Sequence, residues 1–252
     1  MKTDMKQEEK LIKNWTESSS GYSSSILKEL NSFKKQAWTD LILNNAGKEG
    51  KLKILDVGTG PGFFAIIMSL QGHDVSAIDC TQAMLDEAKR NAALYSVEPL
   101  FIQSDTQCLD FADDTFDLVI SRNVVWTIMD AEKAFQEWRR VLKPGGRMIA
   151  FDANWNLRLF NEEKRREYER DQEEYKKRYT DIPFPVHSAE MDDFRKGMPL
   201  CAEIRPQWDL CALVRVGFKR IVCETDLREQ IYDEREQLIN RSTPMFMIIG
   251  EK

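Results

Sequence analysis

The chain has 252 residues, of which 42% are hydrophobic and 31% charged, and its formal net charge is −6. A chain of this length buries enough apolar surface to fold as one sizeable domain without disulfides or metals. The acidic balance disfavours a nucleic-acid partner, because phosphate backbones carry charge of the same sign.

Cysteine usage and apolar run lengths indicate the compartment. The five cysteines are Cys80, Cys108, Cys201, Cys211 and Cys223. Because their number is odd and none lie at CxxC spacing, we expect free thiols in a reducing cytosol and no zinc site. The N-terminus lacks the apolar run of a signal peptide, and no stretch approaches about 18 uninterrupted apolar residues. We therefore expect a cytoplasmic protein with no membrane partner.

Two helical segments are predicted before the first strand. One lies around residues 11–15, and the other runs from Ile26 to about Ala46, with apolar residues recurring at close to 3.6 positions. The run SSSGYSSS at 18–25 lies between them and is predicted to be a flexible turn that acts as a hinge.

From residue 51 the chain alternates between short apolar runs and amphipathic segments. Strands are predicted within 51–58, 73–79, 99–105, 116–122, 147–153, 219–227 and 244–251, and helices within 61–72, 81–96, 130–142 and 208–218. The KPGG run at 143–146 is predicted to be a turn. Strands that alternate with helices imply a parallel sheet with right-handed crossovers.

Three glycines, Gly58, Gly60 and Gly62, follow Asp56 where the first strand meets the first helix. Glycine lets the backbone turn tightly and approach a ligand closely. The helix that follows offers free N–H groups and a positive dipole end. A dinucleotide loop, GxGxxG, would have its third glycine where this chain has Phe63. The loop therefore indicates a ligand smaller than a pyrophosphate, and a purely structural turn is the alternative.

Acidic residues follow the next two strands. Asp79 ends the second strand, 21 positions after Gly58, where a carboxylate can accept both ribose hydroxyls. Asp105 closes the third strand and can accept a hydrogen bond from an exocyclic amine. A helix cap and an ordinary loop aspartate are the alternative roles for these two side chains.

With these residues in this order, the chain resembles the class I S-adenosylmethionine-dependent methyltransferases, in particular the small-molecule, methyltransferase type 11-like members. The resemblance covers about residues 36–152. The stretch 56–62 matches the motif that wraps the methionine part of the cofactor, Asp79 the ribose-binding acid, and 105–106 the adenine-binding turn. Residues 117–126 match the segment that faces the sulfonium end of the cofactor.

The resemblance implies an α/β fold with a Rossmann-like, doubly wound seven-stranded sheet. The implied strand order is 3-2-1-4-5-7-6, with the last strand antiparallel, helices on both faces and a helical insertion or lid. We expect a single methyltransferase domain over 1–252. Its parts are an N-terminal helical lid (1–35), a cofactor-binding core (36–153), a helical insertion that covers the substrate (154–205) and the C-terminal part of the core (206–252).

The resemblance also implies the reaction. S-adenosyl-L-methionine is the expected cofactor and S-adenosyl-L-homocysteine the product, with no metal, a small-molecule acceptor, and a monomer or homodimer. Methyl transfer is an in-line displacement, so the protein mainly aligns the reactants and excludes water. A base is needed only if the nucleophile arrives protonated.

We assign candidate residues to three roles. The predicted cofactor-binding residues are Tyr22, Asp56, Gly58, Thr59, Gly60, Gly62, Asp79, Cys80, Met84, Asp105, Thr106, Ser121 and Arg122. The predicted substrate-binding residues are Asn123, Trp126, Asp152, Asn154, Trp155, Tyr168 and Tyr175. The catalytic candidates are Arg122, Asn123 and His187. Arg122 would suit an acidic acceptor, whereas we interpret His73 as structural.

Three other functions remain open. Methylation of a protein or tRNA is disfavoured by the acidic balance, and SRNVVW stands where such enzymes carry an Asn-Pro-Pro-Tyr type motif. A protein that binds S-adenosylmethionine without transferring the methyl group would bind the cofactor but form no product. An NAD-dependent oxidoreductase is disfavoured by Phe63.

Overall fold

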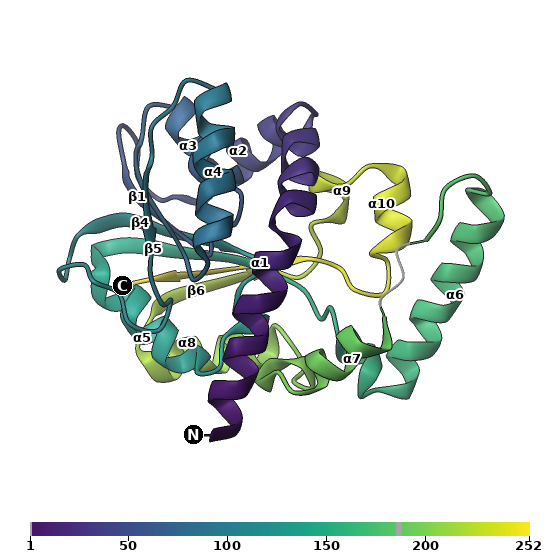
Figure 1. The fold of residues 1–252 in the computed structure, drawn as a ribbon. Coiled ribbons are helices and arrows are strands. Elements are labelled where there is room, and N and C mark those ends of the chain that lie inside the picture. The colour runs from purple at the N-terminus through teal and green to yellow at the C-terminus, as the bar shows by residue number, and fades with distance from the viewer. Residues whose placement is uncertain (1, 185–187) are drawn as a thin grey trace.

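A seven-stranded sheet forms the centre of the computed structural model, which describes residues 2–184 and 188–252, with side chains described from residue 6 (Figure 1). The strands are β1 (Lys53–Val57), β2 (Asp74–Asp79), β3 (Leu100–Gln103), β4 (Phe116–Arg122), β5 (Leu142–Asp152), β6 (Lys219–Glu224) and β7 (Phe246–Glu251). Their order is β3-β2-β1-β4-β5-β7-β6. Strand β7 is antiparallel to β5 and β6, and the other pairs are parallel. The predicted order and the antiparallel last strand are confirmed.

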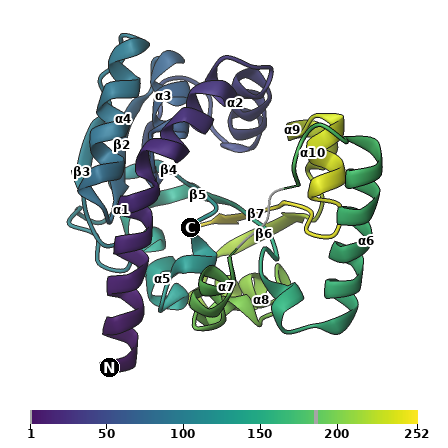
Figure 2. The same cartoon turned by 45° about the vertical axis from the view of Figure 1, so that its right-hand side comes forward.

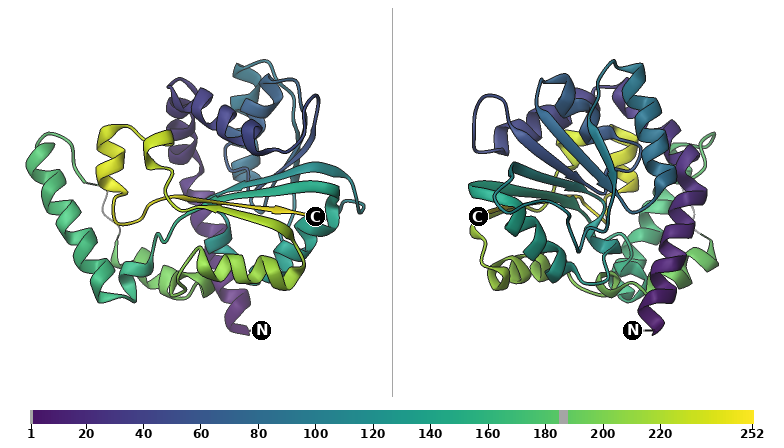
Figure 3. Two further views of the ribbon diagram at one scale, coloured as in Figure 1. Left: turned by 180° about the vertical axis from the view of Figure 1, so that it is seen from behind. Right: turned by 60° about the vertical axis from the view of Figure 1, so that its left-hand side comes forward.

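Helices cover both faces of the sheet. They are α1 (Lys2–Leu30), α2 (Lys34–Asn45), α3 (Phe63–Leu70), α4 (Gln82–Leu94), α5 (Ala131–Val141), α6 (Glu162–Arg178), α7 (Ala189–Lys196), α8 (Gln207–Val216), α9 (Arg228–Ile231) and α10 (Glu234–Ile239). Figures 2 and 3 show α2, α3 and α4 on one side of the sheet and α5 and α8 on the other.

The core consists of two apolar layers, one on each face of the sheet. In β1, Ile54 packs in the layer with α2 and α3, and Leu55 packs in the layer with α5 and α8. Successive strand residues point to opposite faces, so a strand covered on both sides is apolar throughout. This explains the uninterrupted apolar runs of the central strands.

The predicted turn at 18–25 is wrong, because α1 continues through it as one helix. The hydroxyls of Ser19 and Ser24 donate to the carbonyls of Thr16 and Ser20, at 2.9 and 3.1 Å. Ile26, further along the helix, is buried in the core. Burial of the apolar positions therefore outweighs the low helix propensity of serine and glycine. The break lies later, between Leu30 and Lys34.

The KPGG run at 143–146 also differs from the prediction. It belongs to the start of β5, where the pairing with β4 shifts register between Phe116 and Leu118. Gly145 has φ of 73°, which glycine adopts without strain, and its N–H donates to the Lys252 carbonyl at 3.3 Å. The run is therefore a bulged strand and not a turn.

The 154–205 stretch contains α6 and α7. Helix α6 lies at the margin of the molecule and contacts α10 (Figures 1 and 2). Within the part of the chain that the structure describes, we find no helix both long and apolar enough to cross a membrane.

A buried ion-pair network joins this stretch to the sheet. Arg205 donates to Asp152, at the end of β5, at 2.8 Å, and to both carboxylate oxygens of Asp209 in α8, at 2.7 and 2.8 Å. The three side chains are at most 1% exposed. Asp152 also accepts from the Trp126 N–H at 3.1 Å and from the Trp155 indole N–H at 2.8 Å. One carboxylate thus positions the chain after both β4 and β5.

We expect Asp152→Ala to lower the free energy of unfolding by about 3 kcal/mol. The substitution removes one of the two carboxylates that pair with the buried Arg205 guanidinium, and it leaves the Trp126 and Trp155 N–H donors without an acceptor. Urea denaturation measures this loss. Asp110→Ala removes an exposed carboxylate and is the control, with an expected change under about 0.5 kcal/mol. A loss below about 1 kcal/mol for Asp152→Ala would contradict this role.

Candidate functional site

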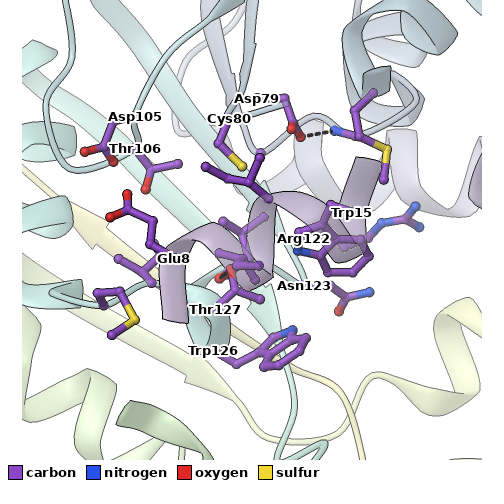
Figure 4. A pocket seen from close by; sticks show the side chains of 18 of the residues that line it. Glu8, Trp15, Asp79, Cys80, Asp105, Thr106, Arg122, Asn123, Trp126 and Thr127 are labelled. Carbon is purple, nitrogen blue, oxygen red and sulfur yellow. Dashed lines mark hydrogen bonds between the residues drawn. The ribbon is translucent and has the colours of Figure 1, made fainter. Parts of the chain in front are cut away.

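A cavity of about 450 Å³ opens at the carboxyl ends of the parallel strands and is covered by α1. Ligands of doubly wound sheets bind at this edge, and the volume is in the range of small-molecule sites. Figure 4 shows Asp79, Asp105 and Trp126 around the cavity, with Glu8 and Trp15 on the helix that crosses it.

The structure brings twelve predicted residues together around the cavity and leaves the others outside its lining. Those that line it are Tyr22, Gly58, Gly60, Asp79, Cys80, Met84, Asp105, Thr106, Arg122, Asn123, Trp126 and Trp155. The described residues that do not line it are Asp56, Thr59, Gly62, Ser121, Asp152, Asn154, Tyr168 and Tyr175. His187 lies outside the described residues.

The turn after β1 requires glycine at two positions. Gly58 has φ of 67°, and a Cβ there would lie 2.3 Å from the Val124 side chain. Gly60 has φ of 53°, and a Cβ there would meet the Tyr22 ring at 3.4 Å and fill the space beside the cavity. The turn therefore presents bare backbone to the cavity, as close approach of a ligand demands.

Asp56 supports this turn from behind. The Thr59 hydroxyl donates to its carboxylate at 2.6 Å, and the Ala65 N–H, in the first turn of α3, donates to the same oxygen at 3.0 Å. Gly62 precedes α3 with φ of 91°, and a Cβ there would lie 3.1 Å from Ala88 in α4. Asp56, Thr59 and Gly62 hold the turn in place and do not line the cavity, and their binding of cofactor stays a prediction.

Asp79 joins the ends of β1 and β2. It accepts from the Gly60 N–H at 3.0 Å, and its other oxygen accepts from the Thr81 N–H and hydroxyl at 2.9 and 3.0 Å. Burial raises the pKa of Asp79, and these hydrogen bonds oppose the shift. A carboxylate has about four acceptor sites, so capacity is left for a hydroxyl of a ligand.

The loop after β3 forms the wall of the cavity beside Asp79. The Asp105 carboxylate accepts from the Gln107 backbone N–H at 2.8 Å and closes a tight turn. The Trp138 indole N–H donates to the Thr106 carbonyl at 3.1 Å and fixes the loop to α5.

Arg122 lines the cavity, but its guanidinium is engaged by groups of the protein. Its guanidinium pairs with Glu29 of α1 at 2.7 Å. It also lies over the ring of Phe63, at 4.5 Å from the centroid, and those of Phe64 and Trp38. Because its charge is compensated inside the protein, Arg122 is not the free cation that an acidic acceptor needs. The cation instead ties α1 to β4.

Tryptophans form the end of the cavity beside β5. Trp126 and Trp155 line it, and Trp155 is oriented by its bond to Asp152. Asp152 and Asn154 lie behind this wall, with Asn154 accepting from the Arg205 N–H at 3.1 Å. These two polar residues therefore position the aromatic wall without lining the cavity.

The tyrosines of α6 lie in a separate apolar cluster. Tyr175 is fully buried against Phe184 and Leu238 of α10, and Tyr168 packs against Phe184. The face of α6 that carries these tyrosines packs against α10 and not toward the cavity.

Eleven lining residues, four of them on α1, were not among the candidates assigned above, although Trp15 lies in the N-terminal segment that we expected to form a lid. The missed residues are Glu8, Leu11, Ile12, Trp15, Gln107, Val124, Thr127, Ile128, Met129, Asn156 and Arg195. The spacing of Leu11, Trp15 and Tyr22 at about one and two helical turns was the available signal, but the predicted turn at 18–25 concealed it.

Asp56→Asn should remove a pH dependence of stability. Burial raises the pKa of Asp56 to about 7, despite the bonds from Thr59 and Ala65. A carboxyl with a raised folded-state pKa stabilises the fold fully below its unfolded pKa, and the contribution is lost as pH rises through the folded pKa. From pH 5 to 8, urea denaturation should show wild type losing about 2 kcal/mol relative to Asp56→Asn. Parallel pH profiles would contradict the buried, protonatable carboxyl.

Curated relatives are similar in sequence to the central part of this chain. Residues 55–150 match a family model described as a methyltransferase domain. The ubiquinone/menaquinone biosynthesis C-methyltransferase UbiE of Desulfotalea psychrophila is 34% identical over 119 residues, 46% of this chain and 48% of the relative. The malonyl-[acyl-carrier protein] O-methyltransferase of Erwinia pyrifoliae is 34% identical over 43% of this chain and 40% of its own. The chain spans about half the length of these relatives.

Solved structures share the fold over most of the chain. YcgJ of Bacillus subtilis has a TM-score of 0.55 and 18% identity, with 85% of this chain and 97% of that chain covered. A Thermotoga maritima protein described as a possible histamine N-methyltransferase has a TM-score of 0.60 and 17% identity, with 94% and 98% covered. Residues 55–150 therefore match a methyltransferase domain, and the chain as a whole shares the fold and strand order of these solved structures.

Proposed function

We propose that this protein transfers a methyl group from S-adenosyl-L-methionine to a small-molecule acceptor. The observation that supports this most is that one cavity contains both the glycine turn with Asp79 and a pocket walled by tryptophans. The curated relatives above are named for C- and O-methylation of small or carrier-bound molecules. We extend the activity, but not their acceptors, to this chain.

The residues of the cavity fit the proposed cofactor. Gly58 and Gly60 leave room for the methionine part, Asp79 has acceptor capacity for a ribose hydroxyl, and the 105–107 turn forms the wall where adenine would lie. Metal chemistry is not part of the proposal. In the part of the chain whose side chains are described, no group of three or more His, Cys, Asp or Glu side chains could hold a metal ion.

When bound, the cofactor would supply a methyl group on a cationic sulfur, which accepts the electron pair of the broken bond and becomes a neutral thioether. The chain's own contribution is alignment and exclusion of water. Trp15 and Trp126 offer ring faces that suit a cation, and α1 covers the opening. Correct alignment alone can supply about 7–11 kcal/mol of barrier reduction.

A small acceptor suits this geometry better than a macromolecule. Helix α1 crosses the cavity, and its side chains Leu11, Ile12 and Trp15 line it from above. The net charge of −6 further disfavours RNA.

Asp79→Ala should weaken binding of S-adenosyl-L-homocysteine about tenfold or more, because it removes the acceptor of a ribose hydroxyl and frees the Gly60 N–H. Isothermal titration calorimetry measures this, with Asp110→Ala as the matched control that removes an exposed carboxylate. NAD should not compete. Equal affinities for the two variants would remove Asp79 from the site.

An enzyme and a protein that only binds the cofactor differ in whether they form a methylated product. Incubation with radiolabelled S-adenosylmethionine and fractionated small-molecule extract should give acceptor-dependent S-adenosylhomocysteine. Tight cofactor binding with no labelled product in any fraction would favour a protein that binds the cofactor without methyl transfer.

A further inference from the structure

A second cation lies in the cavity, at the end away from Asp79. Arg195 of α7 lines the cavity together with Asn156 and Trp155, which follow β5. Asn156 donates to the Cys201 sulfur at 3.2 Å. Burial raises the pKa of the Cys201 thiol, and the nearby charge of Arg195 opposes that rise. Strands β2 and β5 are three positions apart in the sheet, or about 14 Å at the usual strand spacing. This corner is therefore separate from the Asp79 end.

The charge of Arg195 is only partly compensated. Among the described residues, its ion-pair partner is Asp192, at 3.4 Å. Asp192 is held more closely by Arg158, at 2.8 Å, so two guanidinium groups share one carboxylate. The Arg195 Nε is buried and has no hydrogen-bond partner among the described residues. Arg122, in contrast, forms a close ion pair with Glu29 at 2.7 Å.

The surroundings of Arg195 make an uncompensated cation costly. Its side chain is 14% exposed, and the neighbouring cluster of Leu11, Trp126, Met129 and Phe194 is apolar. Burial lowers the pKa of Arg195, Arg158 adds to this effect, and Asp192 opposes it. A buried cation of this kind gains most from an anion that brings its own negative charge into contact.

Resting on the proposed function, we propose that the methyl acceptor carries an anionic group, a carboxylate or a phosphate, that binds Arg195, and an apolar or aromatic body that lies against Trp126 and Trp155. The anion binds at the end of the cavity beside β5, and the nucleophilic atom points back toward β4 and the glycine turn. Arg195 is then a substrate-binding residue that selects acceptors by charge.

This assignment excludes one acceptor class. A cationic amine placed in this corner of the cavity would meet the Arg195 guanidinium, and like charges repel. The tryptophans alone would suit such an amine, so the charge of the acceptor decides between the two possibilities. The choice between a carboxylate and a phosphate is left to the experiment.

The test measures binding to the protein saturated with S-adenosylhomocysteine, which needs no turnover. The probes are matched pairs that differ in charge: indole-3-acetate and indole-3-acetamide, 2-naphthoate and 2-naphthamide, decanoate and decanamide, phenyl phosphate and phenol. In at least one pair the anion should bind about tenfold tighter than its neutral partner. Arg195→Gln should abolish that preference and leave the affinity for S-adenosylhomocysteine unchanged, which shows that the variant is folded.

Lys196→Gln is the control, because it removes the same charge from the neighbouring, exposed position of α7 and should keep the preference. Equal binding of anion and neutral partner in every pair, or a preference that survives in Arg195→Gln, would overturn the inference. Failure of the proposed function is a separate result, because it would appear as loss of S-adenosylhomocysteine binding or of labelled product. A carboxylate-selective result and a phosphate-selective result distinguish the two sources of the anion.

Discussion

The hydrogen bond from the Gly60 N–H to the Asp79 carboxylate is the contact on which the site depends. It joins the turn after β1 to the end of β2, and the Thr59 N–H donates to the Ile78 carbonyl beside it at 2.8 Å. Because Asp79 is buried, this geometry is held by protein groups and needs no ligand to form it. A preorganised cradle of this kind lowers the cost of ordering the site on binding.

The sheet places the other residues of the site beside this contact. Parallel strands bring the ends of β1 to β5 to one edge, and the polar residues that follow them meet there. On the far side, Asp152 and Arg205 fix the loops that carry Trp126 and Trp155. The site is therefore held at two points, by one carboxylate at the end of β2 and by another at the end of β5.

The sequence predicts well the sheet and the residues that line the Asp79 end of the cavity, because their signals are local. Apolar runs, glycine turns and an acid at a strand end can each be identified within a few residues, and strand order follows from the alternation and the resemblance. Asp56 shows the limit of this reasoning, because its motif position predicts a ligand contact, whereas its side chain holds the turn from behind.

The lining at the end of the cavity beside β5 could not be predicted in the same way. Arg195 lines the cavity only because α7 folds back beneath α1, where Gln7 donates to the Phe194 carbonyl at 2.9 Å, a contact between residues 187 positions apart. Tyr175 looks like a site residue in the sequence but packs against Leu238 of α10, and Arg122 lines the cavity but is paired with Glu29 of α1, so both have partners in distant segments. Contacts of this kind depend on tertiary packing, which local spacing does not report.

A crystal structure of the protein with S-adenosylhomocysteine tests the central claim most directly. We expect density in the cavity under α1, with a ribose hydroxyl on the Asp79 carboxylate, adenine beside the 105–107 turn and the sulfur facing the tryptophan-walled end. Density for the compound elsewhere on the surface, or a cavity that takes a nicotinamide dinucleotide in its place, would contradict that claim.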